Sequence, residues 1–443
     1  MKRVLIITYY WPPSGGSGVQ RWVKFAKYLP KEGWQPVIYT PENPELTTID
    51  KTLAAEIPLE AEIVKTHIFE PYGIYRKLMG KGSSTDLKAL TSAGSDGNEV
   101  NPVNGGKKSW KQKLSLYIRG NFFIPDPRIM WVRPSVKFLK SYLKKHPVDA
   151  IVSTGPPQSM HLIGLELSKA TGLPWLADFR DPWTKIFYFK HLELTPRSEA
   201  KHQALEKKVV DGATRVIAVS PMVKNDFEAI TSTPVELITN GFDEEDFNDP
   251  FEADEYFNIT HTGLFASDGD PEILWKVLAA KCQEDKEFRK LLRIRLVGKT
   301  DQEIVNSIET AGLGPNLVNL GYQSHEVAVR EQRNASVLIL PLRKEPEYEA
   351  VLPGKLFEYL ASRRPILGIG QTDGAMARVV RNTGSGIVYN WDDEEKIRQW
   401  IDFSWDEFKN NELLDNASDI SMYSRHKLTK RLASLLEEIT KSR

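Results

Sequence analysis

The sequence of 443 residues predicts an α/β protein that consists of two doubly wound units in tandem. Short apolar runs alternate with amphipathic segments, which is typical of parallel α/β architecture. An acidic, aperiodic stretch at residues 240–256 interrupts this alternation, and a second alternating set follows it. The chain is also too long for one ordinary core, so we expect two domains.

The first set consists of apolar runs of strand length, separated by amphipathic segments. It predicts an N-terminal Rossmann-like domain over residues 1–245. We expect its strands at residues 3–10, 35–40, 61–66, 149–154, 174–179, 214–220 and 235–239, and helices at 18–29, 159–172 and 199–213.

The second set predicts a C-terminal Rossmann-like domain over residues 246–420, with a final helix at 421–443 that packs back on the N-terminal domain. We expect its strands at residues 257–265, 292–299, 316–322, 335–342, 364–370 and 385–390, each followed by a helix. Ligands of doubly wound sheets bind at the carboxyl ends of the strands, and two such domains facing each other enclose a cleft that suits a small molecule.

Two segments of the first half depart from the alternation. Residues 81–107 are rich in Gly, Ser, Asn and Asp, which predicts a mobile loop. Residues 110–146 mix Lys and Arg with Trp, Phe, Tyr and Ile. Such a segment suits an anionic membrane surface, or forms a helix that packs on its own domain with its lysines in water.

The composition limits the partners and the compartment. Lys+Arg and Asp+Glu both number 59, so bulk charge does not favour a nucleic-acid partner. The single cysteine, Cys282, excludes an internal disulfide framework and fits a reducing compartment. No apolar run approaches the roughly 20 residues that span a bilayer, and no signal-peptide cleavage site follows the first strand. We expect a cytoplasmic protein, at most peripheral at the inner face of the cytoplasmic membrane.

The stretch "PPSGGSGVQR" (residues 12–21) joins the first predicted strand to the first predicted helix. Gly15, Gly16 and Gly18 permit a close approach to the backbone, and a helix N-terminus attracts phosphate. The stretch lacks the Gly-Lys of a P-loop and the third glycine of a dinucleotide fingerprint. It therefore predicts a phosphate or acceptor loop, or a tight turn without a ligand. Arg21 either reaches an acidic group or faces solvent.

An ordered set of motifs follows this loop along nearly the whole chain: "VSPMVKNDF" with "ITNGFD", then "THTGLF", "LVGK", "VNLGYQSHEVAVREQRNASVLILPL" and "LPGKLFEYLASRRPILGIG". The set resembles the glycosyltransferases of family 4, which have the GT-B fold. The resemblance implies transfer of a sugar from a nucleotide sugar, as co-substrate, with retention and with neither metal nor other cofactor. The implied acceptor is a cell-envelope glycan or a lipid-linked intermediate of polysaccharide biosynthesis.

The resemblance places the donor site in the "LPGKLFEYL" block. Glu358 stands at the family's final glutamate, which binds the ribose hydroxyls of the nucleotide sugar; a carboxylate can accept both hydrogen bonds of a cis-diol. The family's earlier glutamate is replaced by Ala350, with Glu349 beside it. The Arg and Lys that the family places on the diphosphate are missing from "GLFASDGDPEIL" (residues 263–274).

We expect Lys355 to replace this missing pair. It lies beside Gly354 at the start of a predicted helix, where its ammonium and the helix N–H groups converge on phosphate. Leu356 belongs to the same block. Lys299 and Arg343 follow strands and are further donor candidates, or surface charges. The sequence "DGD" (residues 268–270) precedes a helix without further ligands, so we expect no metal site.

The stretch "LADFRDPW" (residues 176–183) carries the predicted reacting centre. Arg180 stands where the family commonly has a histidine. It cannot act as a base at neutral pH, but its fork can bind a phosphate or a carboxylate. Asp181 is predicted to orient the acceptor hydroxyl or take its proton. The alternative is an Asp–Arg pair that fixes a turn. His161 is a second candidate base, although such a histidine is more often structural.

The stretch "FFIPDPRIMW" (residues 122–131) contributes Asp126 and Arg128, which the resemblance places on the acceptor side. The alternative is an ordinary Pro-rich loop packed by Trp131. Two other functions remain open for the whole chain: a nucleotide-sugar isomerase or epimerase of the same fold, and a non-catalytic nucleotide-binding scaffold.

Overall fold

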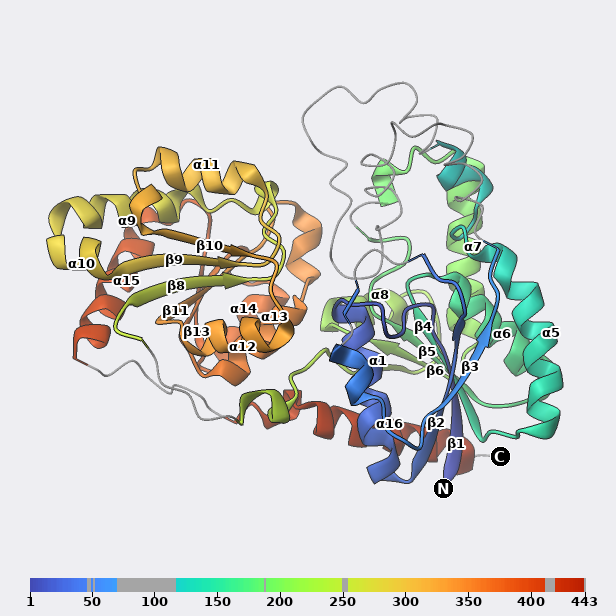
Figure 1. Cartoon of the computed structure of the whole chain (residues 1–443). Coiled ribbons are helices and arrows are strands. Elements are labelled where there is room, and N and C mark those ends of the chain that lie inside the picture. Colours follow the sequence, from blue (N-terminus) through green and yellow to red (C-terminus); the bar gives the residue numbers. More distant parts are fainter. Residues whose placement is uncertain are drawn as a thin grey trace. The chain divides into compact units, whose positions relative to one another are not determined.

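The computed structural model describes residues 1–45, 49–50, 52–69, 117–186, 189–248, 254–410 and 419–441. The predicted mobile loop at 81–107 lies outside these residues. Contacts divide the chain into two compact units, the first formed by residues 1–239 and 425–443 and the second by residues 240–424. Figure 1 shows the sheets of both units.

The first unit contains a parallel sheet with the strand order β3-β2-β1-β4-β5-β6-β7. Each expected strand of the first half is present. The strands are β1 (Lys2–Ile7), β2 (Trp34–Pro41), β3 (Glu62–Thr66), β4 (Ala150–Gly155), β5 (Trp175–Phe179), β6 (Arg215–Ala218) and β7 (Val235–Leu237). The central strands β1, β4 and β5 are almost wholly buried, because helices cover both faces of the sheet.

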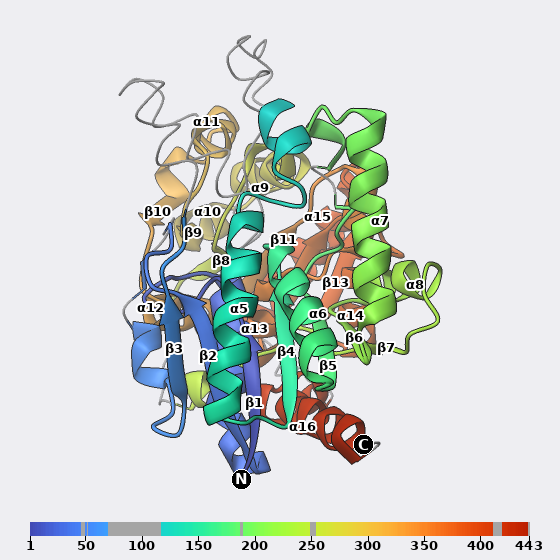
Figure 2. The same ribbon diagram turned by 90° about the vertical axis from the view of Figure 1, so that its right-hand side faces the viewer.

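The helices of the first unit lie on both faces of its sheet. α1 packs with α16 on one face, and α5 packs with α6 on the other (Figures 1 and 2). The helices are α1 (Ser17–Tyr28), α5 (Ile129–Lys145), α6 (Ser159–Thr171), α7 (Pro196–Gly212), α8 (Pro221–Glu228) and α16 (Arg425–Lys441), with 3₁₀ helices η1 (Leu29–Glu32), η2 (Thr52–Glu56) and η4 (Phe189–His191). The C-terminal helix α16 thus belongs to the core of the first unit, to which it contributes Leu432 and Leu436.

The second unit repeats the pattern with the strand order β10-β9-β8-β11-β12-β13, again parallel. Each expected strand of the second half is present: β8 (Phe257–Thr262), β9 (Leu292–Val297), β10 (Leu317–Gly321), β11 (Val337–Pro341), β12 (Ile366–Ile369) and β13 (Gly386–Tyr389). The two observed sheets confirm the predicted doubly wound α/β class.

The sheet of the second unit separates two hydrophobic cores. Along β11, Val337 and Ile339 point into one core while Leu338 and Leu340 point into the other, as the period of two in a strand requires. The helices are α9 (Glu272–Glu284), α10 (Lys286–Leu291), α11 (Gln302–Thr310), α12 (His325–Arg333), α13 (Gly354–Ser362), α14 (Ala375–Asn382) and α15 (Glu394–Lys409), with 3₁₀ helices η5 (Glu244–Phe247), η6 (Ser267–Gly269), η7 (Gly314–Asn316), η8 (Pro346–Ala350) and η9 (Ser421–Tyr423).

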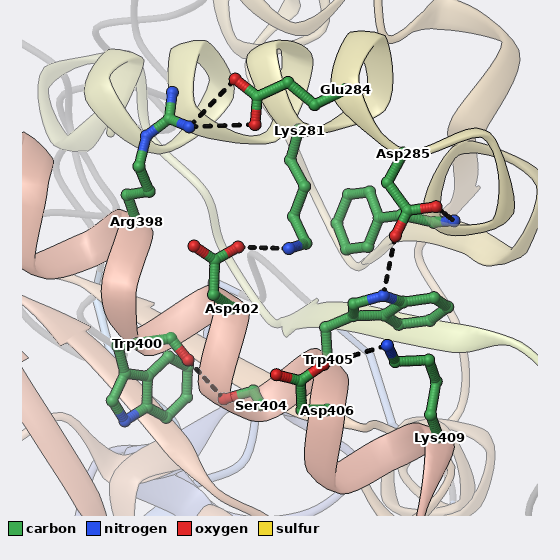
Figure 3. Close-up of polar contacts among 11 residues, drawn as sticks. Lys281, Glu284, Asp285, Arg398, Trp400, Asp402, Ser404, Trp405, Asp406 and Lys409 are labelled. Carbon is green, nitrogen blue, oxygen red and sulfur yellow. Dashed lines mark hydrogen bonds and ion pairs between the residues drawn. The ribbon is translucent and has the colours of Figure 1, made fainter.

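Polar contacts fasten α15 to the junction of α9 and α10 (Figure 3). The Asp285 carboxylate caps α10 by accepting hydrogen bonds from Glu287 N and Phe288 N, and its other oxygen accepts from Trp405 Nε1 at 3.0 Å. Arg398 adds an ion pair with Glu284 at 3.1 Å. Because this junction precedes β9, it lies at the amino ends of the strands, away from the ends where ligands of such sheets bind.

In both sheets the order of the strands reverses beside the strand that comes first in the chain. Strand order changes hand between β1 and β4 in the first unit and between β8 and β11 in the second. Ligands of doubly wound sheets bind outside the carboxyl ends of the strands at this switch point. In each unit a ligand is therefore expected at the loops after these strands, which are β1 and β4 in the first unit and β8 and β11 in the second. Within the described part of the chain, every helix is too short or too polar to cross a membrane.

Candidate functional site

Helix α13 presents Lys355 and Glu358 on one side. The helix begins at Gly354, and Leu356 N donates to Pro353 O at 3.0 Å in its first turn. Leu356 is fully buried in the core beneath the helix. Lys355 and Glu358 are only partly buried, and three residues on a helix bring them to nearly the same face. Leu356 therefore anchors the helix in the core, while the side chains of Lys355 and Glu358 lie at the surface of the helix, where they can contact a ligand.

The Lys355 ammonium reaches the carboxyl end of β8. Its Nζ donates to Leu264 O at 3.0 Å and lies 2.9 Å from His261 Nε2. Burial lowers the pKa of Lys355 to about 7, and the negative charge of Glu358 opposes this shift. Burial and the Lys355 charge together hold the pKa of His261 well below its usual value. His261 is thus neutral, and its Nε2 accepts from the lysine.

Two glycines stand at the carboxyl ends of β8 and β9, and the first of them lies next to Lys355. Gly263 has φ +90°, and a Cβ on it would lie 3.5 Å from Lys355 Nζ. Gly298, after β9, has φ +130°, and a Cβ there would lie 2.2 Å from Gly263 O. Both backbone angles favour glycine, and the second position has no room for a side chain.

A residue of α12 holds the side chain of Glu358 in place. Gln332 Nε2 donates to Glu358 Oε2 at 2.9 Å and to Thr262 Oγ1 at 3.1 Å. Neither His261 nor Gln332 was among the residues that we predicted. His261 stands in the "THTGLF" motif, but nothing in the sequence links it to Lys355, 94 residues away.

Arg343 and Lys299 are the other two basic residues that were predicted to bind the donor, and their surroundings differ from those of Lys355. Arg343 is buried after β11 and forms an ion pair with Asp268 Oδ2 at 2.7 Å, so its charge is directed to the first aspartate of the "DGD" sequence. Burial, aided by the negative charge of Glu345, raises the pKa of Asp268 to about 6. Lys299 is exposed after β9, and its carbonyl accepts a hydrogen bond from Phe265 N at 2.9 Å. Ala350 ends η8, so no carboxylate stands where the family has its earlier glutamate.

In the first unit, the Gly-rich loop follows β1 and leads into α1. Gly16 precedes the helix with φ 106°, an angle that favours glycine, and its carbonyl accepts from Val19 N and Gln20 N at 3.1 Å. Gly15 and Gly18 flank it. The loop is thus a tight strand-to-helix turn at the switch point.

Arg21 does not face solvent. Its Nη2 lies 2.7 Å from Asp178 Oδ1 and its Nε 3.2 Å from Oδ2, and both side chains are almost completely buried. Asp178 also accepts from Trp22 Nε1 and Thr154 Oγ1. Burial alone would raise the pKa of Asp178, but the charge of Arg21 and these hydrogen bonds outweigh burial and lower it. The pair ties the helix after the Gly-rich loop to the end of β5.

The residues on both sides of Asp181 are anchored. Arg180 Nε donates to Gly155 O at 3.3 Å, and its Nη2 contacts Pro156 O. On the other side, Thr184 N and Oγ1 donate to the Glu206 carboxylate of α7 at 3.1 and 2.5 Å. Trp183 Nε1 also donates to His202 Nδ1 of α7, at 3.2 Å. Glu206 and His202 were not predicted, because they lie on a helix distant in sequence.

Asp181 itself accepts no hydrogen bond from the residues that the structure describes. Burial raises the pKa of its carboxyl, and the Arg180 charge opposes that shift. Because Arg180 directs its guanidinium to the carbonyls of Gly155 and Pro156, the two side chains do not form a hydrogen-bonded pair. The described hydrogen bonds of Arg180 thus go to backbone carbonyls at the end of β4 and in the loop that follows it.

His161 lies in the first turn of α6, and Asp126 contacts this turn from the loop before α5. His161 is fully buried; its Nδ1 lies 2.9 Å from Ser153 Oγ, and burial lowers its pKa to about 3. These contacts fit a neutral imidazole in the core better than a base. Asp126 accepts from Ser159 N and Oγ at 2.8 and 2.9 Å, so it caps α6. Arg128 is buried with its guanidinium carbon 4.6 Å from the centre of the Tyr9 ring.

The chain also matches a known family at the level of sequence. The sequence profile of Glycosyltransferase Family 4 matches residues 91–246, which span the loop after β4, the Asp181 loop and α7. Residues 91–246 are thus similar to a glycosyltransferase family 4 domain. Enzymes of this family use nucleotide sugars as donors. Comparison with curated protein sequences gives no match.

Solved structures of glycosyltransferases share the fold of the whole chain. Sucrose-phosphate synthase from Thermosynechococcus elongatus superposes with a TM-score of 0.58 at 14% identity, covering 100% of this chain and 97% of its own. HepE from Anabaena, solved with UDP-glucose, gives 0.58 at 14% identity, with 99% and 100% covered. WaaG, involved in lipopolysaccharide biosynthesis, gives 0.54 at 12% identity, with 98% and 99% covered. At these identities the likeness shows the GT-B fold class.

Proposed function

We propose that this protein is a family 4 glycosyltransferase, which transfers a sugar from a nucleotide sugar to a cell-envelope glycan or lipid-linked acceptor, with retention and without a metal ion. The second unit binds the donor, and the first unit binds the acceptor. The family match and the fold shared with HepE, whose structure contains UDP-glucose, support the donor class. The fold shared with WaaG, which is involved in lipopolysaccharide biosynthesis, supports the acceptor class.

The position of Lys355 is the observation that carries the donor half of this proposal. A diphosphate in a partly dry site needs positive charge, because an unpaired buried anion is very costly. The loop at residues 263–274 supplies none, yet Lys355 reaches into this loop from α13 through Leu264 O. The ammonium therefore offers charge at the strand ends where the family's missing pair would act, while Glu358 on the same face takes the ribose.

The surroundings of Asp181 support the part of the proposal that concerns the acceptor. It follows β5, its neighbours are fixed from two sides, and its carboxylate has no hydrogen-bond donor among the described residues. A raised pKa and an unpaired carboxylate suit a group that orients a hydroxyl and takes its proton. The positive charge of Arg180 opposes the effect of burial on the pKa of Asp181 and so favours the ionised carboxylate.

The reaction needs one bond broken and one formed. The bond from the anomeric carbon to the diphosphate oxygen breaks, and the negative charge that develops on the leaving diphosphate is stabilised by Lys355 and the first N–H groups of α13. The acceptor oxygen bonds to the anomeric carbon on the same face, and its proton passes to Asp181.

The acceptor class agrees with the surface of α5. Met130 and Phe138 are exposed on this helix, with 51% and 39% of their surfaces accessible, among the exposed Arg133, Lys137 and Lys140. Basic and apolar groups in this mixture attract an anionic membrane surface. We propose that the protein works in the cytoplasm and lies at the inner face of the cytoplasmic membrane, where lipid-linked acceptors are found.

Turnover of nucleotide sugars tests the function directly. The purified protein is screened against nucleotide sugars by thermal shift, and stabilising donors are then incubated with lipid-linked and free glycan acceptors. The proposal expects release of nucleoside diphosphate that depends on an acceptor, with the product linked in the donor's anomeric configuration. Conversion of the donor sugar without any acceptor would instead identify an isomerase, and binding without turnover would identify a scaffold.

A further inference from the structure

A buried glutamine of α12 contacts the proposed ribose-binding carboxylate. Gln332 is 1% exposed, and its amide oxygen has no hydrogen-bond partner among the described residues, so the contacts of its side chain are those of the amide nitrogen. Both hydrogens of its Nε2 are used, one by Glu358 Oε2 at 2.9 Å and the other by Thr262 Oγ1 at 3.1 Å. The residue therefore links α13 to β8.

Thr262 fixes the other end of this link. Its main-chain N–H donates to the Tyr359 hydroxyl at 2.8 Å, and Tyr359 is the residue after Glu358 on α13. Two adjacent residues of α13 are thus tied to one residue of β8, the first through Gln332 and the second directly. This arrangement fixes both the position of α13 and the direction of the Glu358 side chain.

The orientation of the Gln332 amide is determined by its neighbours. Turning the amide over would place its oxygen against the Glu358 carboxylate, and two acceptors repel each other. Among the residues that the structure describes, no second group hydrogen-bonds to the Glu358 carboxylate. Oε2 is therefore held by the amide, while Oε1 keeps its full capacity to accept hydrogen bonds from a ligand.

We infer that Gln332 is the positioning residue for ribose recognition: it holds Glu358 so that Oε1 meets the 2′- and 3′-hydroxyls, and thereby makes the site select ribonucleotides over 2′-deoxyribonucleotides. The inference rests on the proposed function, in which Glu358 binds the donor ribose. Selectivity follows because a carboxylate fixed toward a hydroxyl loses that hydrogen bond when the hydroxyl is absent.

The ratio of affinities for a ribonucleoside diphosphate and its 2′-deoxy counterpart tests this role. The four ribonucleoside diphosphates are first ranked by thermal shift, and the tightest is compared by calorimetry with its deoxy form. We expect the wild type to prefer the ribo form at least about tenfold, since a hydrogen bond to a charged group is strong. Gln332→Met keeps size and burial but cannot donate, and should reduce the preference to about threefold or less.

Control variants separate this role from general destabilisation. Gln399 on α15 makes the same kind of bond, from its Nε2 to Glu395 Oε1 at 2.8 Å, so Gln399→Met should leave the ratio unchanged. Thr262→Val removes the other bond of Gln332 but keeps the bond to Glu358, and should retain most of the preference. If Gln332→Met fails to fold, Gln332→Asn keeps the amide but is one methylene short of Glu358, and should lose the preference likewise.

Glu358→Ala distinguishes failure of this inference from failure of the proposed donor site. If Glu358→Ala loses the ribose preference and Gln332→Met or Gln332→Asn retains it, the positioning role of Gln332 is overturned while the donor site stands. If Glu358→Ala keeps the preference, Glu358 does not contact ribose, and the donor site and the inference fall together.

Discussion

Lys355 of α13 and His261 of β8 form a partly buried hydrogen bond, with Nζ 2.9 Å from Nε2, between residues 94 positions apart in the chain. Because His261 is neutral, it orients the lysine without neutralising it. The same ammonium donates to Leu264 O. A cation is thus fixed at the end of β8, where the loop itself contains no basic residue.

This relationship makes nucleoside-diphosphate binding depend on pH. Burial lowers the pKa of Lys355 to about 7, so in the free protein the charge is present below that pH and is lost as the pH rises through it. A bound diphosphate favours the charged form and raises the pKa, so binding near pH 8 should take up a proton. Calorimetry in two buffers of different ionisation enthalpy measures that uptake. Lys355→Arg, which stays charged, should show none; equal uptake in the variant would assign the proton to another group.

Asp181→Asn should impair the reaction without impairing donor binding. The amide keeps the shape but cannot take a proton, and loss of a general base lowers turnover about 10²- to 10⁴-fold. Nucleoside-diphosphate affinity should change less than about twofold, because the proposed donor groups lie in the second unit. Asp226→Asn, which removes an exposed ion pair with Lys185, serves as the control. Turnover within about threefold of wild type would remove Asp181 from the chemistry.

Asp178→Asn should destabilise the first unit. Breaking a buried ion pair by removing one partner costs about 3–5 kcal/mol, because it leaves the Arg21 charge uncompensated. Denaturant unfolding followed by fluorescence measures the loss. The double variant Arg21→Met with Asp178→Leu should recover most of it, since an apolar pair leaves no buried charge. A loss below about 1 kcal/mol in the single variant would contradict the structural role of this pair.

The surface of α5 should bind anionic vesicles. Reversing the charge of Lys137 and Lys140 together should weaken co-sedimentation with phosphatidylglycerol vesicles at least about tenfold, at roughly 1 kcal/mol per basic residue near the surface. The matched control reverses the exposed Lys201 and Lys208 of α7. Equal loss in both pairs would indicate only bulk charge, and binding to neutral vesicles alone would point to Met130 and Phe138.

The sequence contains enough local information to predict the strands, because each buried parallel strand is a short apolar run such as "VLIITYY" or "SVLILPL". It also indicates the loops at the strand ends. It does not reveal contacts between distant residues. Arg21 was equally compatible with solvent or an acidic partner, and only the fold brings it to Asp178. Likewise Gln332 stands among charged residues of an ordinary amphipathic helix, and its link to Glu358 depends on how α12 packs beside α13.

The central claim is that α13 holds the nucleotide-sugar donor through the phosphate-binding Lys355. Calorimetry with a nucleoside diphosphate and with the corresponding nucleoside tests it most directly, in wild type, Lys355→Met and the exposed control Lys276→Met. The account predicts that Lys355→Met lowers nucleoside-diphosphate affinity about 10- to 100-fold, the value of a hydrogen bond to a charged group, and changes nucleoside affinity less than about twofold. Equal losses for the two ligands, or none, would contradict it and leave the phosphates to backbone N–H groups alone.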